Sequence, residues 1–120
     1  MNKWFFITMI IGAVFSACQD EDCHTSGALS YNADIQPIFN EHCATSGCHT
    51  SASKSGGLDL SAGNSFAELS KSGSGYINTT KPTSSVLYSA MRSTMPPSGK
   101  LDDCTLEKIE KWMEQGAKNN

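Results

Sequence analysis

Two cysteines and a histidine stand close together in the stretch "EHCATSGCHT", residues 41–50. Four residues separate Cys43 from Cys48, and His49 follows the second cysteine directly. Thiols and an imidazole at this spacing could attach a c-type haem, whose usual motif is C-x-x-C-H, or they could bind a metal ion. They could also form a disulfide beside a histidine that has no role. The rest of the chain must decide between these interpretations.

A zinc site has the right ligand types, with Cys43, Cys48, His49 and either His42 or His24 as ligands. Three of these residues would be crowded into adjacent positions, however. A zinc site would also leave the Met95-Pro-Pro sequence without a role. The sequence therefore favours haem over zinc at this motif.

The first twenty residues, "MNKWFFITMIIGAVFSACQD", are typical of an exported protein. Lys3 precedes an apolar run over residues 4–15, which is too short to span a bilayer and has the length of a signal-peptide core. The residues before Cys18 are small, and the whole segment resembles a bacterial lipoprotein signal, in which residues 1–17 are removed and Cys18 carries the lipid. An ordinary signal peptide cut nearby and an N-terminal anchor helix are the alternatives. We expect a protein of the bacterial cell envelope, lipid-anchored on the periplasmic side or at the cell surface.

The chain has 120 residues and a formal net charge of −3, so one mildly acidic domain is expected. Loss of Lys3 with the signal peptide would bring the formal charge to −4, which argues against a nucleic-acid partner. Apolar residues are sparse, and Ser, Thr and Gly crowd residues 50–75. A domain of this size and composition has marginal stability unless a disulfide, a metal or a bound group adds to its core. A non-peptide group is therefore expected to complete the core.

Five cysteines in an exported protein require an explanation: Cys18, Cys23, Cys43, Cys48 and Cys104. If the first carries lipid and the pair at 43 and 48 binds haem, Cys23 and Cys104 remain to form a disulfide. Such a bridge would contribute about 2–4 kcal/mol. Two disulfides among the last four cysteines would also use every thiol, so the number of cysteines alone does not discriminate.

The pattern before the motif predicts a polar tether over residues 18–30 and then a short helix. Asp34 is the expected N-cap, and Pro37 falls in the first turn, where proline is tolerated. The apolar face of this helix consists of Ile35, Ile38, Phe39 and Cys43. Residues 50–84 read as a loop wrapped around something, with one or two helical turns over residues 64–70.

The C-terminal part predicts two further helices and no strand. Residues 84–92 form a helix capped by Ser84 or Ser85, and residues 93–100 an extended loop that prolines stiffen. The inward face of this helix consists of Val86, Leu87, Ala90 and Met91. Asp102 or Asp103 caps the last helix, which Gly116 ends. Its apolar face consists of Leu106, Ile109, Trp112 and Met113.

The order of these motifs resembles small single-haem cytochrome c domains, and most of all the cytochrome c-like domains of bacterial envelope proteins. The motifs that carry the likeness are "DIQPIFNEHCATSGCH", "GGLDL", "SVLYSAM", "MPPSGKL" and "IEKWMEQGA", and they cover about residues 31–118. The resemblance implies an all-α fold of three to five short helices around one haem c.

By this resemblance, Cys43 and Cys48 form thioethers to the haem vinyl groups, and His49 is the proximal iron ligand. Met95 matches the distal ligand, and Trp112 matches the aromatic residue that packs the last helix against the first. The two extra residues between the cysteines depart from the family pattern, and we expect this segment to bulge outward.

Three alternatives concern the sixth iron ligand. Met91 lies one helical turn before Met95 and is a rival, as is His24 in the tether. Met95 could also be a core residue, because methionine readily fills gaps.

The function implied by the resemblance is electron transfer to and from redox partner proteins of unknown identity, without enzymatic activity. One alternative is a haem-bearing accessory domain that recruits a partner. Another is a ligand-sensing or peroxidase-like haem site, which applies if Met95 does not bind iron.

Overall fold

The computed structural model describes Cys23 and residues 25–120. The expected signal peptide, Cys18 as the expected site of lipidation, and His24 lie outside these residues. The described part is helical and contains no strand, in agreement with an all-α class. Its elements are η1 (Tyr31–Ile35), α1 (Gln36–His42), η2 (Ser55–Gly57), α2 (Ser65–Leu69), η3 (Pro82–Ser84), α3 (Val86–Ser93) and α4 (Asp103–Glu114). None of the described helices is long and apolar enough to cross a membrane.

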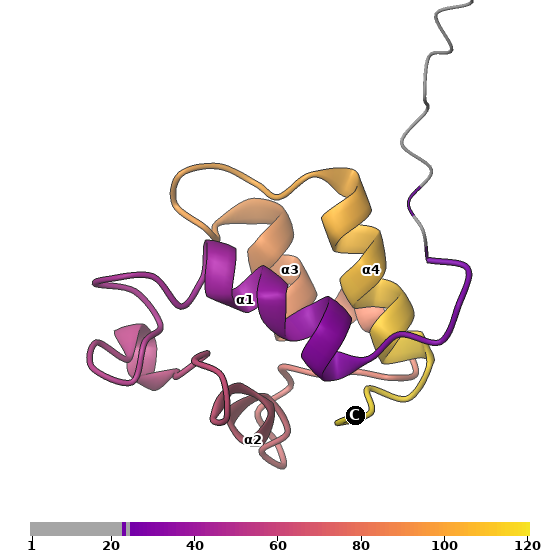
Figure 1. Cartoon of the computed structure of the whole chain (residues 1–120), viewed down its shortest axis with the longest axis horizontal. Coiled ribbons are helices and arrows are strands. Elements are labelled where there is room, and N and C mark those ends of the chain that lie inside the picture. Colours follow the sequence, from indigo (N-terminus) through magenta and orange to yellow (C-terminus); the bar gives the residue numbers. More distant parts are fainter. Residues whose placement is uncertain (1–22, 24) are drawn as a thin grey trace, which may run out of the picture.

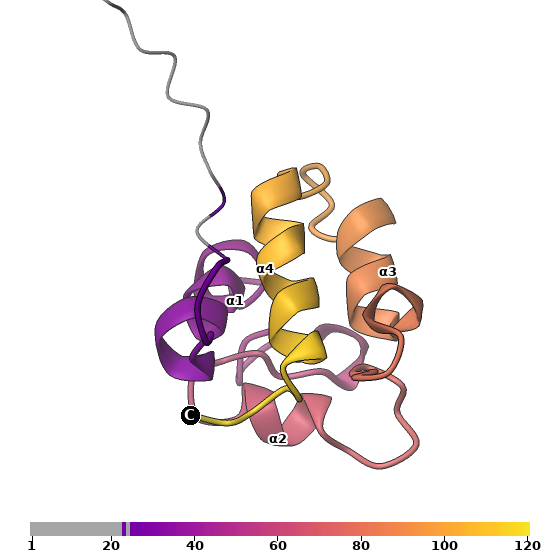
Figure 2. The same cartoon turned by 90° about the vertical axis from the view of Figure 1, so that its right-hand side faces the viewer.

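Helices α3 and α4 lie side by side, and α1 runs across them (Figures 1 and 2). Helix α4 also packs against η1, whereas α2 lies at one end of the molecule. The core between these elements is built from fully buried apolar side chains: Ile35, Phe39, Leu69, Met91, Ile109, Trp112 and Met113. Burial of these side chains is the main force that holds the short helices together, because helices of this length are marginal alone.

The first helical segment begins earlier than Asp34, the N-cap expected from the sequence. Ser30 is the N-cap, and its hydroxyl accepts a hydrogen bond from the Ala33 N–H. Asp34 instead points back, and its carboxylate accepts the Ser30 N–H at 2.7 Å. The Ser30 hydroxyl thus caps the Ala33 N–H and the Asp34 carboxylate caps the Ser30 N–H, an arrangement similar to a capping box, so the helix starts one turn earlier.

Residues 50–84 are packed against the domain rather than serving as a spacer. Leu60 and Leu69 are buried, and Leu58, Phe66, Tyr76 and Ile77 pack against the core. The expected helical turns over residues 64–70 are present as α2.

Helix α3 begins after its N-cap Ser85, whose hydroxyl accepts the Tyr88 N–H. Leu87 and Met91 are buried as expected, but Val86 is 48% exposed. Val86 is the first residue of the helix, and its side chain lies beside a cavity rather than against another element.

The loop after α3 is turned, not extended as its prolines suggested. The Met95 N–H still donates to the Ala90 carbonyl oxygen at 2.8 Å, which continues the end of the helix. The Pro96 carbonyl oxygen then accepts the Gly99 N–H at 3.1 Å. Two prolines restrict φ but do not prevent their carbonyls from closing a turn.

Helix α4 starts at its N-cap Asp102 and ends before Gly116, as the sequence predicts. Trp112 is 1% exposed, and its ring centroid lies 5.3 Å from that of Tyr31. The last helix therefore meets the first helical segment through this indole.

The segment before η1 is fastened to α4 by the expected disulfide between Cys23 and Cys104, with a Cα–Cα distance of 5.2 Å. The side-chain amide of Gln115 binds this segment as well. It accepts the Leu29 N–H and donates to the Gly27 carbonyl oxygen. Residues 25–30 of the polar segment thus lie against the domain.

Candidate functional site

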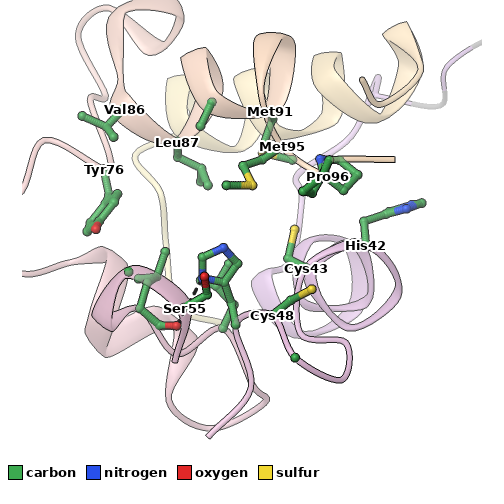
Figure 3. A pocket seen from close by; sticks show the side chains of 17 residues that line it. His42, Cys43, Cys48, Ser55, Tyr76, Val86, Leu87, Met91, Met95 and Pro96 are labelled. Atoms are coloured by element: carbon green, nitrogen blue, oxygen red, sulfur yellow. Dashed lines mark hydrogen bonds between the residues drawn. The ribbon is translucent and has the colours of Figure 1, made fainter. Parts of the chain in front are cut away.

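A cavity of about 340 Å³ lies between the end of α1 with the loops that follow it and helix α3 with the Met95 loop. The Sγ atoms of Cys43 and Cys48 lie on one side of it, and Met91, Met95 and Pro96 lie on the other (Figure 3). Its other lining residues are His42, Gly47, His49, Ser55, Gly56, Leu58, Leu60, Tyr76, Val86, Leu87, Ala90 and Pro97. The cavity thus brings together all four residues that the sequence singled out for haem, at a volume usual for a ligand site.

The two cysteines are placed by the end of α1 and a closed turn. Cys43 is the C-cap of α1, and its N–H donates to the Phe39 carbonyl oxygen at 2.9 Å. The Cys48 N–H donates to the Thr45 carbonyl oxygen, and Gly47 has a φ of +79°, which suits glycine. The two extra residues of the motif are therefore absorbed in a turn.

Cys43 is buried and Cys48 is half-buried, and neither forms a disulfide. Burial, together with a smaller contribution from the neighbouring Cys48, raises the pKa of Cys43 to about 11. A thiol with such a pKa is protonated at neutral pH and is a poor nucleophile. Cys43 is therefore ill suited to act as an attacking thiolate in redox catalysis or disulfide exchange.

His49 is held by its backbone and its ring. Its N–H donates to the Cys43 carbonyl oxygen at 3.1 Å, and its carbonyl oxygen accepts the Leu60 N–H at 2.7 Å. Nδ1 of the ring lies 3.3 Å from the Leu58 carbonyl oxygen. Because a carbonyl can only accept, Nδ1 carries the proton in this contact, and Nε2 keeps its lone pair for a metal ion.

The opposite wall of the cavity is fixed by the start of α3. The N–H groups of Val86 and Leu87 donate to the carbonyl oxygens of Gly75 and Tyr76, which tie the preceding loop to the helix. Met91 is fully buried, whereas Met95 is partly exposed where it lines the cavity. Both rival methionines therefore line the same wall. Met91 is also a core residue.

His42 lies at the edge of the cavity, and its ring points away from it (Figure 3). Its Nε2 lies 3.9 Å from the carboxylate of Glu41. Among the residues that the structure describes, no three His, Cys, Asp or Glu side chains form a group that could hold a metal ion. The zinc alternative with His42 gains no support from this geometry, and His24 lies outside the described residues.

The residues that support His49 on the side away from the cavity were not predicted from the sequence. These belong to the extended segment Leu58–Leu60 and to Gln36 of α1, whose amide Nε2 donates to the Leu60 carbonyl oxygen at 3.1 Å. The alternation of apolar and acidic residues in "GGLDL" is a weak signal for an extended segment, in which the two leucines point to one side and the aspartate to the other. The contact with Gln36 is non-local and left no pattern in the sequence.

Comparison with known protein families gives one match: the family model of the Planctomycete cytochrome C matches residues 46–99. The match covers less than half of the chain and includes Cys48, His49 and Met95, whereas Cys43 lies outside it. It supports a cytochrome c-like domain, which implies a c-type haem and, at a coarse level, haem-based electron transfer. No curated protein and no solved structure matches the chain.

Proposed function

We propose that this protein transfers electrons through one haem c, attached by thioethers at Cys43 and Cys48 and ligated by His49 and Met95. One observation carries the proposal. Three segments of the chain converge on a single cavity, and they place two thiols, an imidazole and a thioether around it. Each of these groups has the chemistry that c-type attachment and axial ligation of iron require.

The cavity suits a porphyrin in the character of its walls. Apart from the two histidines and the thiols, its lining is almost entirely apolar, and it contains no Asp, Glu, Lys or Arg. Leu58, Leu60 and Leu87 present aliphatic side chains to the space, which is the environment that a flat aromatic macrocycle prefers. A haem there would also supply the apolar volume that the sparse core lacks.

When bound, the haem supplies the Fe(II)/Fe(III) couple. His49 would hold the iron through Nε2, because the Leu58 carbonyl oxygen already engages Nδ1. Met95 would ligate from the opposite wall, and a His/Met pair raises the reduction potential. If His49 and Met95 both bound the iron, no coordination position would remain for a substrate, so we infer a carrier rather than an enzyme.

We also propose that the mature protein is held to a membrane of the bacterial envelope by lipid on Cys18 and serves redox partner proteins there. The support is the signal-like sequence of residues 1–17 and the disulfide, which fits an oxidising compartment. Globomycin, an inhibitor of lipoprotein signal cleavage, should cause an uncleaved precursor to accumulate. Unchanged processing in its presence would contradict lipidation.

Covalent attachment is the most direct test of the haem proposal. The protein, produced in a host that matures c-type cytochromes, should retain haem through denaturing electrophoresis. The double variant Cys43→Ser, Cys48→Ser should lose the haem-stained band. The matched control Cys23→Ser, Cys104→Ser should keep it, because those cysteines form a disulfide away from the cavity lining. Haem that extracts freely from the parent protein would refute c-type attachment.

Carbon monoxide separates the carrier from the sensing or peroxidase-like alternative. The reduced parent protein should not bind carbon monoxide, because Met95 occupies the sixth position. Rapid binding by the parent would show an open iron and favour a ligand-sensing site. An accessory domain would instead bind its partner equally well with and without haem reduction.

A further inference from the structure

The segment Leu58–Leu60 runs behind His49 and contacts it at two points. The Leu58 carbonyl oxygen faces Nδ1 of the ring, and the Leu60 N–H binds the His49 carbonyl oxygen. Leu58 has extended backbone angles, φ −103° and ψ 126°. Leu58 and Leu60 both line the cavity, and the side chain of Asp59 between them takes no part in that lining. The orientation of the imidazole therefore depends on where this segment lies.

Helix α1 holds the segment on one side through Gln36, which is 6% exposed. Its Nε2 donates to the Leu60 carbonyl oxygen, and its Oε1 accepts the hydroxyl of Ser65. The Ser65 hydroxyl in turn accepts the Tyr31 hydroxyl at 2.6 Å. Each member of this chain is buried and paired, so the amide of Gln36 has a defined orientation.

Asp59 holds the same segment from the following turn and is 1% exposed. Its Oδ1 accepts the Ser61 N–H and its Oδ2 accepts the Asn64 amide, both at 3.0 Å. The carboxylate thereby joins the segment to the start of α2, which also carries Ser65. Gln36 and Asp59 thus fasten one short strand-like segment at two separate places.

We propose that Gln36 and Asp59 are positioning residues for the iron ligand: they hold Leu58–Leu60 so that its carbonyl fixes the tautomer and orientation of His49. This inference rests on the proposed function, because it assigns the role of His49 to iron ligation. Hydrogen bonding at the distal nitrogen of a metal-bound imidazole fixes its ring and raises its basicity. A cavity-lining role alone does not explain either residue, since neither side chain lines the cavity.

The test follows the Nδ1 proton of His49 in the reduced haem protein, under carbon monoxide if the sixth position is open, so that the iron is diamagnetic. Its exchange with solvent is measured by NMR. Gln36→Met keeps a side chain of similar length but removes the donor to Leu60. It should accelerate exchange about tenfold, equivalent to about 1.4 kcal/mol. The reduction potential of the Gln36→Met protein should also rise, because a less basic imidazole favours Fe(II).

Matched variants separate positioning from general loss of stability. Gln115→Met removes an amide that also binds two backbone groups, at Leu29 and Gly27, and should leave both readouts unchanged. Asp59→Asn should accelerate exchange, whereas Asp103→Asn, at an exposed carboxylate, should not. If Gln36→Met does not fold, Ser65→Ala removes the hydroxyl that orients the Gln36 amide and that also accepts the Tyr31 hydroxyl, and it should shift exchange in the same direction.

The outcomes distinguish the two proposals. A parent protein without covalent haem overturns the proposed function. The positioning role is overturned if the parent protein holds covalent haem but the folded variants exchange the His49 proton at the parental rate. The variants are Gln36→Met, or Ser65→Ala in its place, and Asp59→Asn. Equal acceleration in Gln115→Met also overturns it, because the effect would then be one of stability alone.

Discussion

Removal of the Cys23–Cys104 disulfide should destabilise the domain more than any single surface change. The bridge joins residues 81 positions apart, so it closes a long loop in the unfolded chain. The loop-closure entropy for that length corresponds to about 4.5 kcal/mol at 25 °C, as an upper estimate. The contacts of Thr25 with Glu107 and of Leu29 with Gln115 remain possible after reduction, so the native fold itself should persist.

The assay is urea denaturation of the haem-loaded protein, followed by circular dichroism. With a urea dependence of about 2 kcal/mol per M, the double variant Cys23→Ser, Cys104→Ser should unfold at a urea concentration about 2 M lower than the parent. The parent treated with a reductant should behave like the variant. Thiol labelling under denaturing, non-reducing conditions should find neither cysteine free in the parent. A change of midpoint below about 0.5 M would refute the entropic reasoning, since the slope would then have to be unreasonably large, about 9 kcal/mol per M.

Three further predictions concern the sixth iron ligand, the loss of stability at acid pH and the packing of the core. Met95→Ala should lower the reduction potential, remove the sulfur-to-iron charge-transfer band of the oxidised protein and let carbon monoxide bind the reduced form. Met91→Leu should have none of these effects and should lower the free energy of unfolding by less than about 1.5 kcal/mol, because Met91 is a buried packing residue. Equal spectra for Met95→Ala and the parent would exclude Met95 as a ligand. Hydrogen bonds, first of all from the Ser61 N–H, hold the pKa of Asp59 at about 2, below its usual value. Because the folded-state pKa is lowered, this stabilisation is present above about pH 4 and is lost as the pH falls toward 2. Asp59→Asn should therefore flatten the fall in unfolding free energy between pH 4 and pH 2, and a parallel fall in both proteins would contradict this assignment. Trp112→Ala should cost about 3–5 kcal/mol, measured by urea denaturation, because the indole is 1% exposed and contacts Tyr31; a loss below about 1 kcal/mol would show that the core collapses around the gap.

Local signals were sufficient to predict the helices that carry strong caps and clear periodicity. Helix α4 has an aspartate cap, four apolar residues on one face and a terminal glycine, and all of these act within the helix itself. Helix α3 and its Ser85 cap could be predicted for the same reason. The start of the first helical segment could not be predicted, because Ser30 and Asp34 both have capping chemistry. Only the backbone N–H groups that they bind, those of Ala33 and Ser30, decide which residue begins the helix.

For the candidate site, the residue types and their order along the chain were enough to single out Cys43, Cys48, His49 and Met95. Only cysteine has a thiol, only histidine an imidazole and only methionine a thioether, so a site that needs these groups can be recognised from the residue types in a short motif. The sequence alone also suggested the pairing of Cys23 with Cys104 once the other thiols had uses, although it left a second arrangement open.

Only the tertiary structure decided how these groups are presented. It placed both Met91 and Met95 on one wall and turned the loop after α3 back on itself. It also placed Leu58–Leu60 behind His49, with Gln36 and Asp59 holding that segment in position. The bonds of Asp59 are local, but the other hydrogen bonds of this support join residues 9 to 29 positions apart, and such contacts impose no periodicity on the sequence. They form only when the helices have packed and water has left the groups that must then pair with one another.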